Sequence, residues 1–266
     1  MGHQRLGKLP ALRSLPEIVR YLVAGGTPTD DLVDQVTRIG QDALKRGQQD
    51  PLFVEALWLL ARLPQAVGSP DVAGACQEIG LPDTLPTTLS EMLVVYDSAL
   101  ERFQRRQHAH VTDLGEIARR AGASALGEAI QSRLPSLWQP TADDLRTTLS
   151  TLKGTESFAV MAHSFYANFV GRVIRYYVDR NLHKMVGVDR LSRSVSDLRT
   201  FDDAIKRHCN EAALIMRNFA RDWMGKNHYR DGRTVTRQDM GSFSAFAVEK
   251  IGRELEQRKG QRKDLS

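Results

Sequence analysis

Hydrophobic residues recur with helical spacing along nearly the whole chain, and no run alternates between apolar and polar positions as a half-buried strand would. The segment 155–185 shows this pattern most clearly. Phe158, Phe165, Phe169 and Val173 fall on one stripe, and further apolar residues cover most of the remaining circumference. Because a helix that is apolar on most sides lies inside a bundle, the pattern predicts an all-α fold with this helix near its centre.

Short helices, punctuated by proline and glycine, are predicted in the first half of the chain. Asp50-Pro51 is a typical helix start, and this helix is expected to stop before Pro64. A longer helix is expected over about 88–107, and Thr112 is expected to cap another that breaks near Gly122. The pattern predicts an irregular array of helical hairpins.

Composition changes in the middle of the chain. All ten prolines lie before residue 141, and net charge changes from −2 over residues 1–140 (14 Lys/Arg, 16 Asp/Glu) to +7 over 141–266 (23 Lys/Arg, 16 Asp/Glu). Helices are expected at about 142–152, 155–185, 196–225 and 237–259. We therefore predict two domains: a Pro-punctuated helical array over 1–138, followed by a basic helical bundle over 141–266.

The two cysteines and the lack of long apolar runs restrict the setting. Cys76 and Cys209 lie far apart, and Cys209 falls within an apolar helical stripe, so each is expected to be a reduced thiol. No run of 18 apolar residues and no signal-peptide pattern is present. A cytoplasmic protein without membrane contact is the expectation.

One polar strip interrupts the apolar surface of segment 155–185: Asn168, Arg172, Arg175, Asp179 and His183. Two interpretations are open. In the first, the two guanidiniums bind a phosphate or carboxylate, and Asp179 orients His183. In the second, Arg175 and Asp179 pair along the helix, and the strip is its solvated edge.

A basic patch on the C-terminal half is a second candidate binding surface. It includes Arg217, Arg221, Arg230 and Arg233, with aromatic residues interleaved, as a phosphate-contacting surface would have. Acidic residues are mixed into the same segments, so a solvated face of mixed charge is the alternative interpretation.

Arg221 and His228 are separated by six residues. This spacing resembles the Arg-x(4–6)-His motif of HEPN-type ribonucleases, an all-α family in which the arginine and histidine act on RNA phosphate. The resemblance implies that Arg221 and His228 are the catalytic pair. Arg102/His108 and Arg105/His110 satisfy the same spacing.

Other catalytic and cofactor motifs do not occur. The sequence contains neither of the two glycine-rich phosphate-binding loops, G-x-G-x-x-G and G-x-x-x-x-G-K-[ST]. It also has no G-x-S-x-G nucleophile elbow. His208 and Glu211 could contribute to a metal site, but no second ligand pair with suitable spacing lies nearby. We therefore expect no cofactor and no metal.

The segment 165–187, which begins Phe-Tyr-Ala-Asn-Phe, resembles bacterial proteins encoded in multi-gene operons, phage-defence operons among them. The resemblance implies an accessory subunit that acts with partner proteins, and it brings no catalytic residues. Our leading hypothesis is a non-enzymatic adaptor whose N-terminal half docks a protein and whose basic C-terminal half contacts nucleic acid. The alternatives are the HEPN-like ribonuclease and a bundle that binds a small anionic ligand.

Overall fold

The computed structural model of the chain describes residues 30–107, 111–135, 137, 139–181, 203, 206–207, 209–211, 213–226 and 234–263. These residues form an all-α helical bundle and contain no strand. Its helices, in chain order, are α2 (Asp30–Gly47), α3 (Pro51–Val67), α4 (Val72–Glu78), α5 (Leu89–Arg106), α6 (Asp113–Gln131), α7 (Ala142–Thr151), α8 (Thr155–Asn181), α10 (Leu214–Met224) and α11 (Arg237–Lys263).

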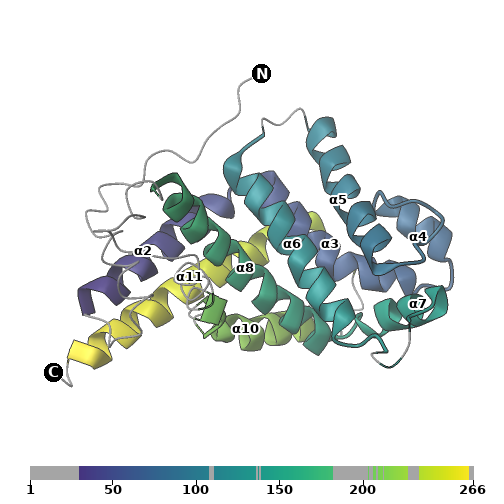
Figure 1. Cartoon of the computed structure of the whole chain (residues 1–266). Coiled ribbons are helices and arrows are strands. Elements are labelled where there is room, and N and C mark those ends of the chain that lie inside the picture. The colour runs from purple at the N-terminus through teal and green to yellow at the C-terminus, as the bar shows by residue number, and fades with distance from the viewer. Residues whose placement is uncertain are drawn as a thin grey trace.

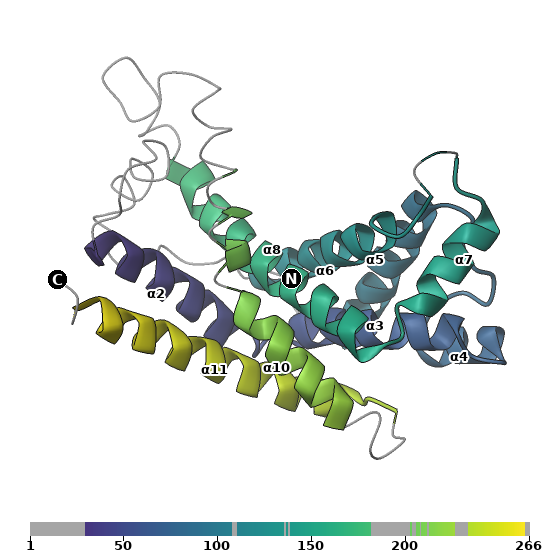
Figure 2. The same cartoon turned by 90° about the horizontal axis from the view of Figure 1, so that it is seen from below.

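The helix with the predicted aromatic stripe lies in the middle of the bundle. Helix α8 lies between α6 and α10, while α2 and α11 run beside each other at one side of the molecule (Figures 1 and 2). The expected stripe of Phe158, Phe165, Phe169 and Val173 is buried. The central position of this helix, predicted from its apolar surface, is confirmed.

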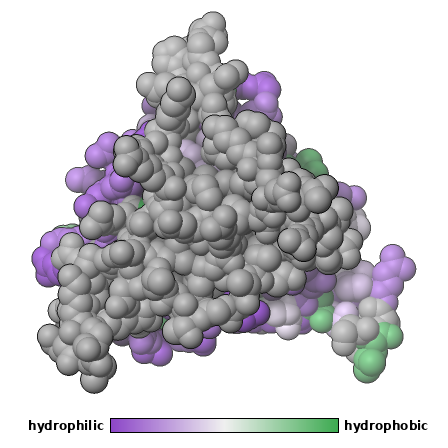
Figure 3. Space-filling view, turned by 60° about the vertical axis from the view of Figure 1, so that its left-hand side comes forward, coloured by the Kyte–Doolittle hydropathy of each residue, from purple (hydrophilic) through white to green (hydrophobic). Residues whose placement is uncertain are grey.

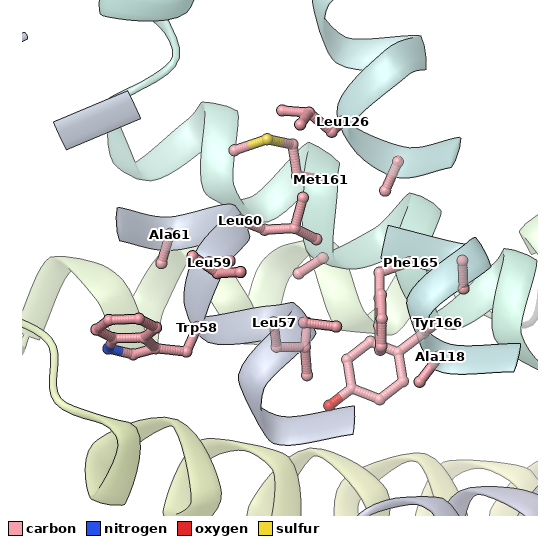
Figure 4. Packing of buried hydrophobic residues seen from close by; sticks show 14 of the residues in the cluster. Leu57, Trp58, Leu59, Leu60, Ala61, Ala118, Leu126, Met161, Phe165 and Tyr166 are labelled. Atoms are coloured by element: carbon pink, nitrogen blue, oxygen red, sulfur yellow. The ribbon is translucent and has the colours of Figure 1, made fainter. Parts of the chain in front are cut away.

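Helix α3 is just as central, because it contacts α4, α5, α6, α7, α8 and α11. Its Phe53 ring packs edge-on against Phe165 and Phe169 of α8, with ring centroids 4.9 Å apart in both pairs. Figure 4 shows further side chains of α3 beside residues of α6 and α8. Such aromatic contacts stabilise a core beyond the area that they bury.

One hydrophobic core runs from Ile39 to Val248 and includes residues of both predicted domains. Helices from the first half, α3 and α6, pack directly against α7 and α8 from the second. The two predicted units therefore share a core, and the position of a domain boundary near 139–140 stays a prediction.

Two helices continue past the residues that were expected to end them. Pro64 lies inside α3, three residues before its end, where Gly68 N–H still donates to the Pro64 carbonyl (3.0 Å). Helix α6 runs through Gly122 without a break. Both expectations were wrong for one reason: burial against neighbouring helices outweighs a local helix-breaking preference of about 1–3 kcal/mol.

No described helix is both long enough and apolar enough to cross a membrane. Where Figure 3 colours the surface, hydrophilic residues prevail and hydrophobic colour is confined to small spots. The sequence also predicts a helix that Ser14 opens and Gly25-Gly26 ends, and a polar loop over 227–235. That helix and residues 227–233 of the loop lie outside the described residues.

Asp50 joins the N-termini of two helices that are distant in sequence. Its carboxylate accepts from Leu52 N–H (2.9 Å) at the start of α3 and from the Thr112 hydroxyl, which itself caps α6 through Gly115 N–H (2.8 Å). The first turns of α3 and α6 are thereby held at one carboxylate.

We expect Asp50→Ala to lower the free energy of unfolding by about 2 kcal/mol, because two caps are lost together. Asp71→Ala is the matched control, since Asp71 caps only the short α4 through Gly74 N–H (3.0 Å). In urea denaturation, the decrease in the free energy of unfolding for Asp71→Ala should be at most half of that for Asp50→Ala. Equal losses in the two variants would contradict a shared cap at Asp50.

Candidate functional site

A row of polar residues lines the contact between α6 and α8. On α8 these residues are Ser164, Asn168, Arg172 and Tyr176, and their spacing of four places them on one face of the helix. Each of them donates a hydrogen bond to α6. Ser164 and Asn168 donate to Glu128. Arg172 donates to Ser124, and Tyr176 donates to Asp113. Residue numbers fall on α6 as they rise on α8, so the two helices run antiparallel along this polar seam.

Arg172 is the least satisfied member of the seam. Its Nη2 donates to the Ser124 hydroxyl (2.8 Å), whereas its Nε is buried and has no hydrogen-bond partner among the residues that the structure describes. Within the described part of the chain it makes no ion pair. Burial lowers the pKa of Arg172, and the charges of Arg175 and Arg120 lower it further, while Glu128 acts in the opposite direction. Arg172 is thus a half-buried cation close to two other cations.

Arg175 and Asp179 lie on the same predicted strip and both have interaction partners. Arg175 is half-buried and lies near Cys209. Burial raises the pKa of the Cys209 thiol to about 12, and the positive charge of Arg175 acts in the opposite direction. Cys209 is buried, as its place in an apolar stripe predicted. The proposed pairing of Arg175 with Asp179 stays a prediction, and His183 lies outside the described residues.

The described part of the C-terminal basic patch faces a carboxylate. Glu156 of α8 accepts from Arg217 Nε (2.9 Å) and Nη2 (2.5 Å), and its other oxygen lies 3.7 Å from Arg221 Nη1. Arg221 Nη2 also donates to Asn218 (3.1 Å). These groups are about half exposed, so the ion pairs contribute little stability. Their main consequence is to reduce the positive potential of this face.

The remaining candidates of the basic patch and of the ribonuclease motif, Arg230, Arg233 and His228, lie outside the described residues. The pairing of Arg221 with His228 therefore stays a prediction from spacing. In the described chain, no group of three or more His, Cys, Asp or Glu side chains could hold a metal ion.

Sequence reasoning found Asn168 and Arg172 on the α8 side of the seam, and it missed Ser164, Tyr176 and the whole α6 side. Arg120, Ser124 and Glu128 are spaced by four residues and form a polar row that matches the row on α8. This spacing is visible in the sequence. Its meaning depends on the antiparallel packing of α6 on α8, which local periodicity does not predict.

Comparison of the chain with protein-family models, with curated proteins and with solved structures finds no match.

Proposed function

We propose that this chain is a non-enzymatic helical-bundle protein that binds an anionic ligand at Arg172, in the seam between α6 and α8. The observation that carries the proposal is the buried Nε of Arg172, a charged donor with no acceptor, close to the cations Arg120 and Arg175. A buried charged donor without a partner is costly, and an oxygen of a phosphate or carboxylate removes that cost.

The surroundings of Arg172 support an oxyanion as the ligand. Among the described residues its only hydrogen bond goes to the neutral hydroxyl of Ser124, and the guanidinium fork can still offer Nε and Nη1 to two oxygens. Arg120 is exposed, and its Nε lies 3.4 Å from Glu116 Oε1, so its guanidinium can approach a ligand from the solvent side. Glu128 is the nearby acid, and it accepts from Ser164 Oγ (2.5 Å) and Asn168 Nδ2 (3.4 Å).

A thermal-unfolding titration with inorganic phosphate, ATP and citrate tests this proposal. At a free ligand concentration of 100 times Kd, we expect about 2.7 kcal/mol of added stability in the unmodified chain. Arg172→Gln should abolish this stabilisation. Arg146→Gln, which removes an exposed arginine of α7, should leave it unchanged.

Two results would sink the proposal. One is an unmodified chain that none of the three anions stabilises. The other is an Arg172→Gln variant that is stabilised as strongly as the unmodified chain, since the bound anion would then lie elsewhere.

A second proposal is the accessory subunit that the resemblance of segment 165–187 implies, acting with protein partners in the bacterial cytoplasm, phage defence included. Exposed apolar side chains favour it: Leu214 on α10 and Phe246 on α11 are 52% and 60% exposed, on two helices that pack together. A protein partner would cover such side chains, and contact with nucleic acid through the basic half belongs to the same proposal.

A further inference from the structure

Four arginines from three helices gather around the end of α4, outside the α6–α8 seam. They are Arg62 of α3, Arg102 and Arg106 of α5, and Arg237 at the start of α11. They are separated by up to 175 positions in the sequence (237 minus 62), so the fold alone brings them together.

The turn after α4 is the point on which the two α5 arginines converge. Leu81 N–H donates to the Cys76 carbonyl (2.9 Å) and Gly80 N–H to the Gln77 carbonyl (3.0 Å), with Gly80 at φ 79°. This is the Schellman geometry, in which glycine takes the left-handed position. Arg102 Nη2 donates to the Gly80 carbonyl (2.8 Å).

Arg106 approaches the same turn, and a side-chain carbon added to Gly80 would lie 3.5 Å from its Nη2. Both Arg102 and Arg106 are exposed. Arg106 makes no hydrogen bond or ion pair within the described residues, so its guanidinium is available to a ligand in solution.

Arg62 and Arg237 extend the positive charge towards α11. The charge of Arg237 lowers the pKa of Arg62, which burial lowers further and more strongly, while Glu78, two residues before Gly80, raises it. Arg62 Nη1 donates to Gln65 Oε1 (2.8 Å), and its buried Nε has no hydrogen-bond partner in the described part of the chain. The charge of Arg62 is therefore coupled both to that of Arg237 and to that of Glu78 at the end of α4.

Aromatic rings hold Arg237 in place. Its Cζ lies 3.7 Å from the centroid of a Trp58 ring and 5.8 Å from that of Phe103, and Glu55 accepts from its Nε (2.5 Å) and Nη2 (2.8 Å). The acids that these contacts bring to the cluster are Glu55 and Glu78. Glu55 is bound by Arg237, and Glu78 acts on Arg62.

We propose that this arginine cluster, Arg62, Arg102, Arg106 and Arg237, binds the phosphate backbone of a nucleic acid. All four cations are arginines, whose planar fork matches the oxygens of a phosphate better than the point charge of lysine. They lie on three helices, and three of them (Arg102, Arg106 and Arg237) are exposed, which suits a chain of phosphates running over the surface. The inference is independent of anion binding at Arg172, and it places the contact largely on the N-terminal half.

Fluorescence-anisotropy titration of the full chain tests this inference, with labelled single-stranded DNA and RNA of about 20 nucleotides, at about 50 and 200 mM salt. We expect the Arg102→Gln/Arg106→Gln variant to bind at least about tenfold more weakly at the lower salt, and the slope of log K against log salt to shrink by about 1–2. Arg106→Gln alone should show part of the loss, and it removes no hydrogen bond or ion pair within the described residues.

The matched control is Arg146→Gln/Arg207→Gln, which removes two exposed arginines elsewhere and the same net charge. It should bind within about threefold of the unmodified chain. Three results would overturn the inference: no binding by the unmodified chain at the lower salt, equal losses in both double variants, or competition by poly-glutamate as effective as that by unlabelled oligonucleotide. The last would identify a surface for acidic polypeptides.

Discussion

Replacing Arg237 by Ala is expected to lower the free energy of unfolding by about 3–5 kcal/mol, the largest loss we predict for any single charged residue. The reason lies in its partner. Glu55 is only 2% exposed on the central helix α3, and Arg237 holds both of its carboxylate oxygens. Without the guanidinium, the carboxylate would be a buried charge whose desolvation nothing offsets.

Arg237 also fixes the start of α11 to α3 in two further ways. The guanidinium stacks on Trp58, and the Trp58 Nε1–H donates to the Val235 carbonyl (2.9 Å), two residues before Arg237. A cation over an indole contributes about 0.5–2 kcal/mol. Removal of the side chain therefore weakens the attachment of α11 as well as the ion pair.

Two variants separate the buried charge from the lost contacts in urea denaturation. The double variant Glu55→Met/Arg237→Met removes both charges and keeps side-chain volume, so it should recover most of the stability that Arg237→Ala loses. Arg237→Lys keeps the charge but loses the fork geometry, and its loss should be intermediate. If Arg237→Ala unfolds within about 1 kcal/mol of the unmodified chain, Glu55 has another partner and our account of the pair is wrong.

The contact between Glu55 and Arg237 also shows where prediction from the sequence ends. Local signals served well where one turn of chain decides the outcome: Thr88 and Thr112 cap α5 and α6, and the helix expected at 142–152 is α7, capped by Thr141. The aromatic stripe of α8 is buried because periodicity reports which face of a helix is apolar.

Partner choice could not be predicted in the same way. Glu156 lies 61 residues from Arg217, and Glu55 lies 182 residues from Arg237. Nothing in the local sequence distinguishes these acids from any other acidic residue. From sequence alone a charged side chain is predicted to be exposed to solvent, and only the fold shows which charged residue lies beside it. For this reason the sequence located Arg172 and missed Arg120, and it located the α10 arginines without the acid that reduces their charge.

Gly122→Ala is expected to destabilise the protein by about 1–3 kcal/mol, although alanine is the better helix former. A side-chain carbon at residue 122 would overlap the hydroxyl of Tyr96 and lie 3.0 Å from its Cζ. Tyr96 is fully buried and its hydroxyl donates to the Ala56 carbonyl of α3 (2.8 Å), so the ring cannot move aside without losing this bond.

Gly127→Ala, five residues further along α6, is the matched control. An added carbon there meets only the methyl groups of Leu93, at 3.5 and 3.7 Å, which is ordinary van der Waals contact. We therefore expect the free energy of unfolding of this variant to rise by up to about 1 kcal/mol, because alanine restricts the conformations of the unfolded chain. Opposite signs for the two substitutions in one helix are a sharper result than either value alone.

A double-mutant cycle with Tyr96→Phe identifies the cause. Tyr96→Phe alone should cost about 1 kcal/mol, since it removes the hydrogen bond to Ala56. In the Gly122→Ala background the same change removes the overlapping oxygen, so its cost should vanish or reverse, which makes the two substitutions non-additive. Additive losses would mean that α6 shifts away from α5 as a whole. In that case the Tyr96 hydroxyl would not be the reason why residue 122, at which the sequence predicted a break in the helix, has to be a glycine.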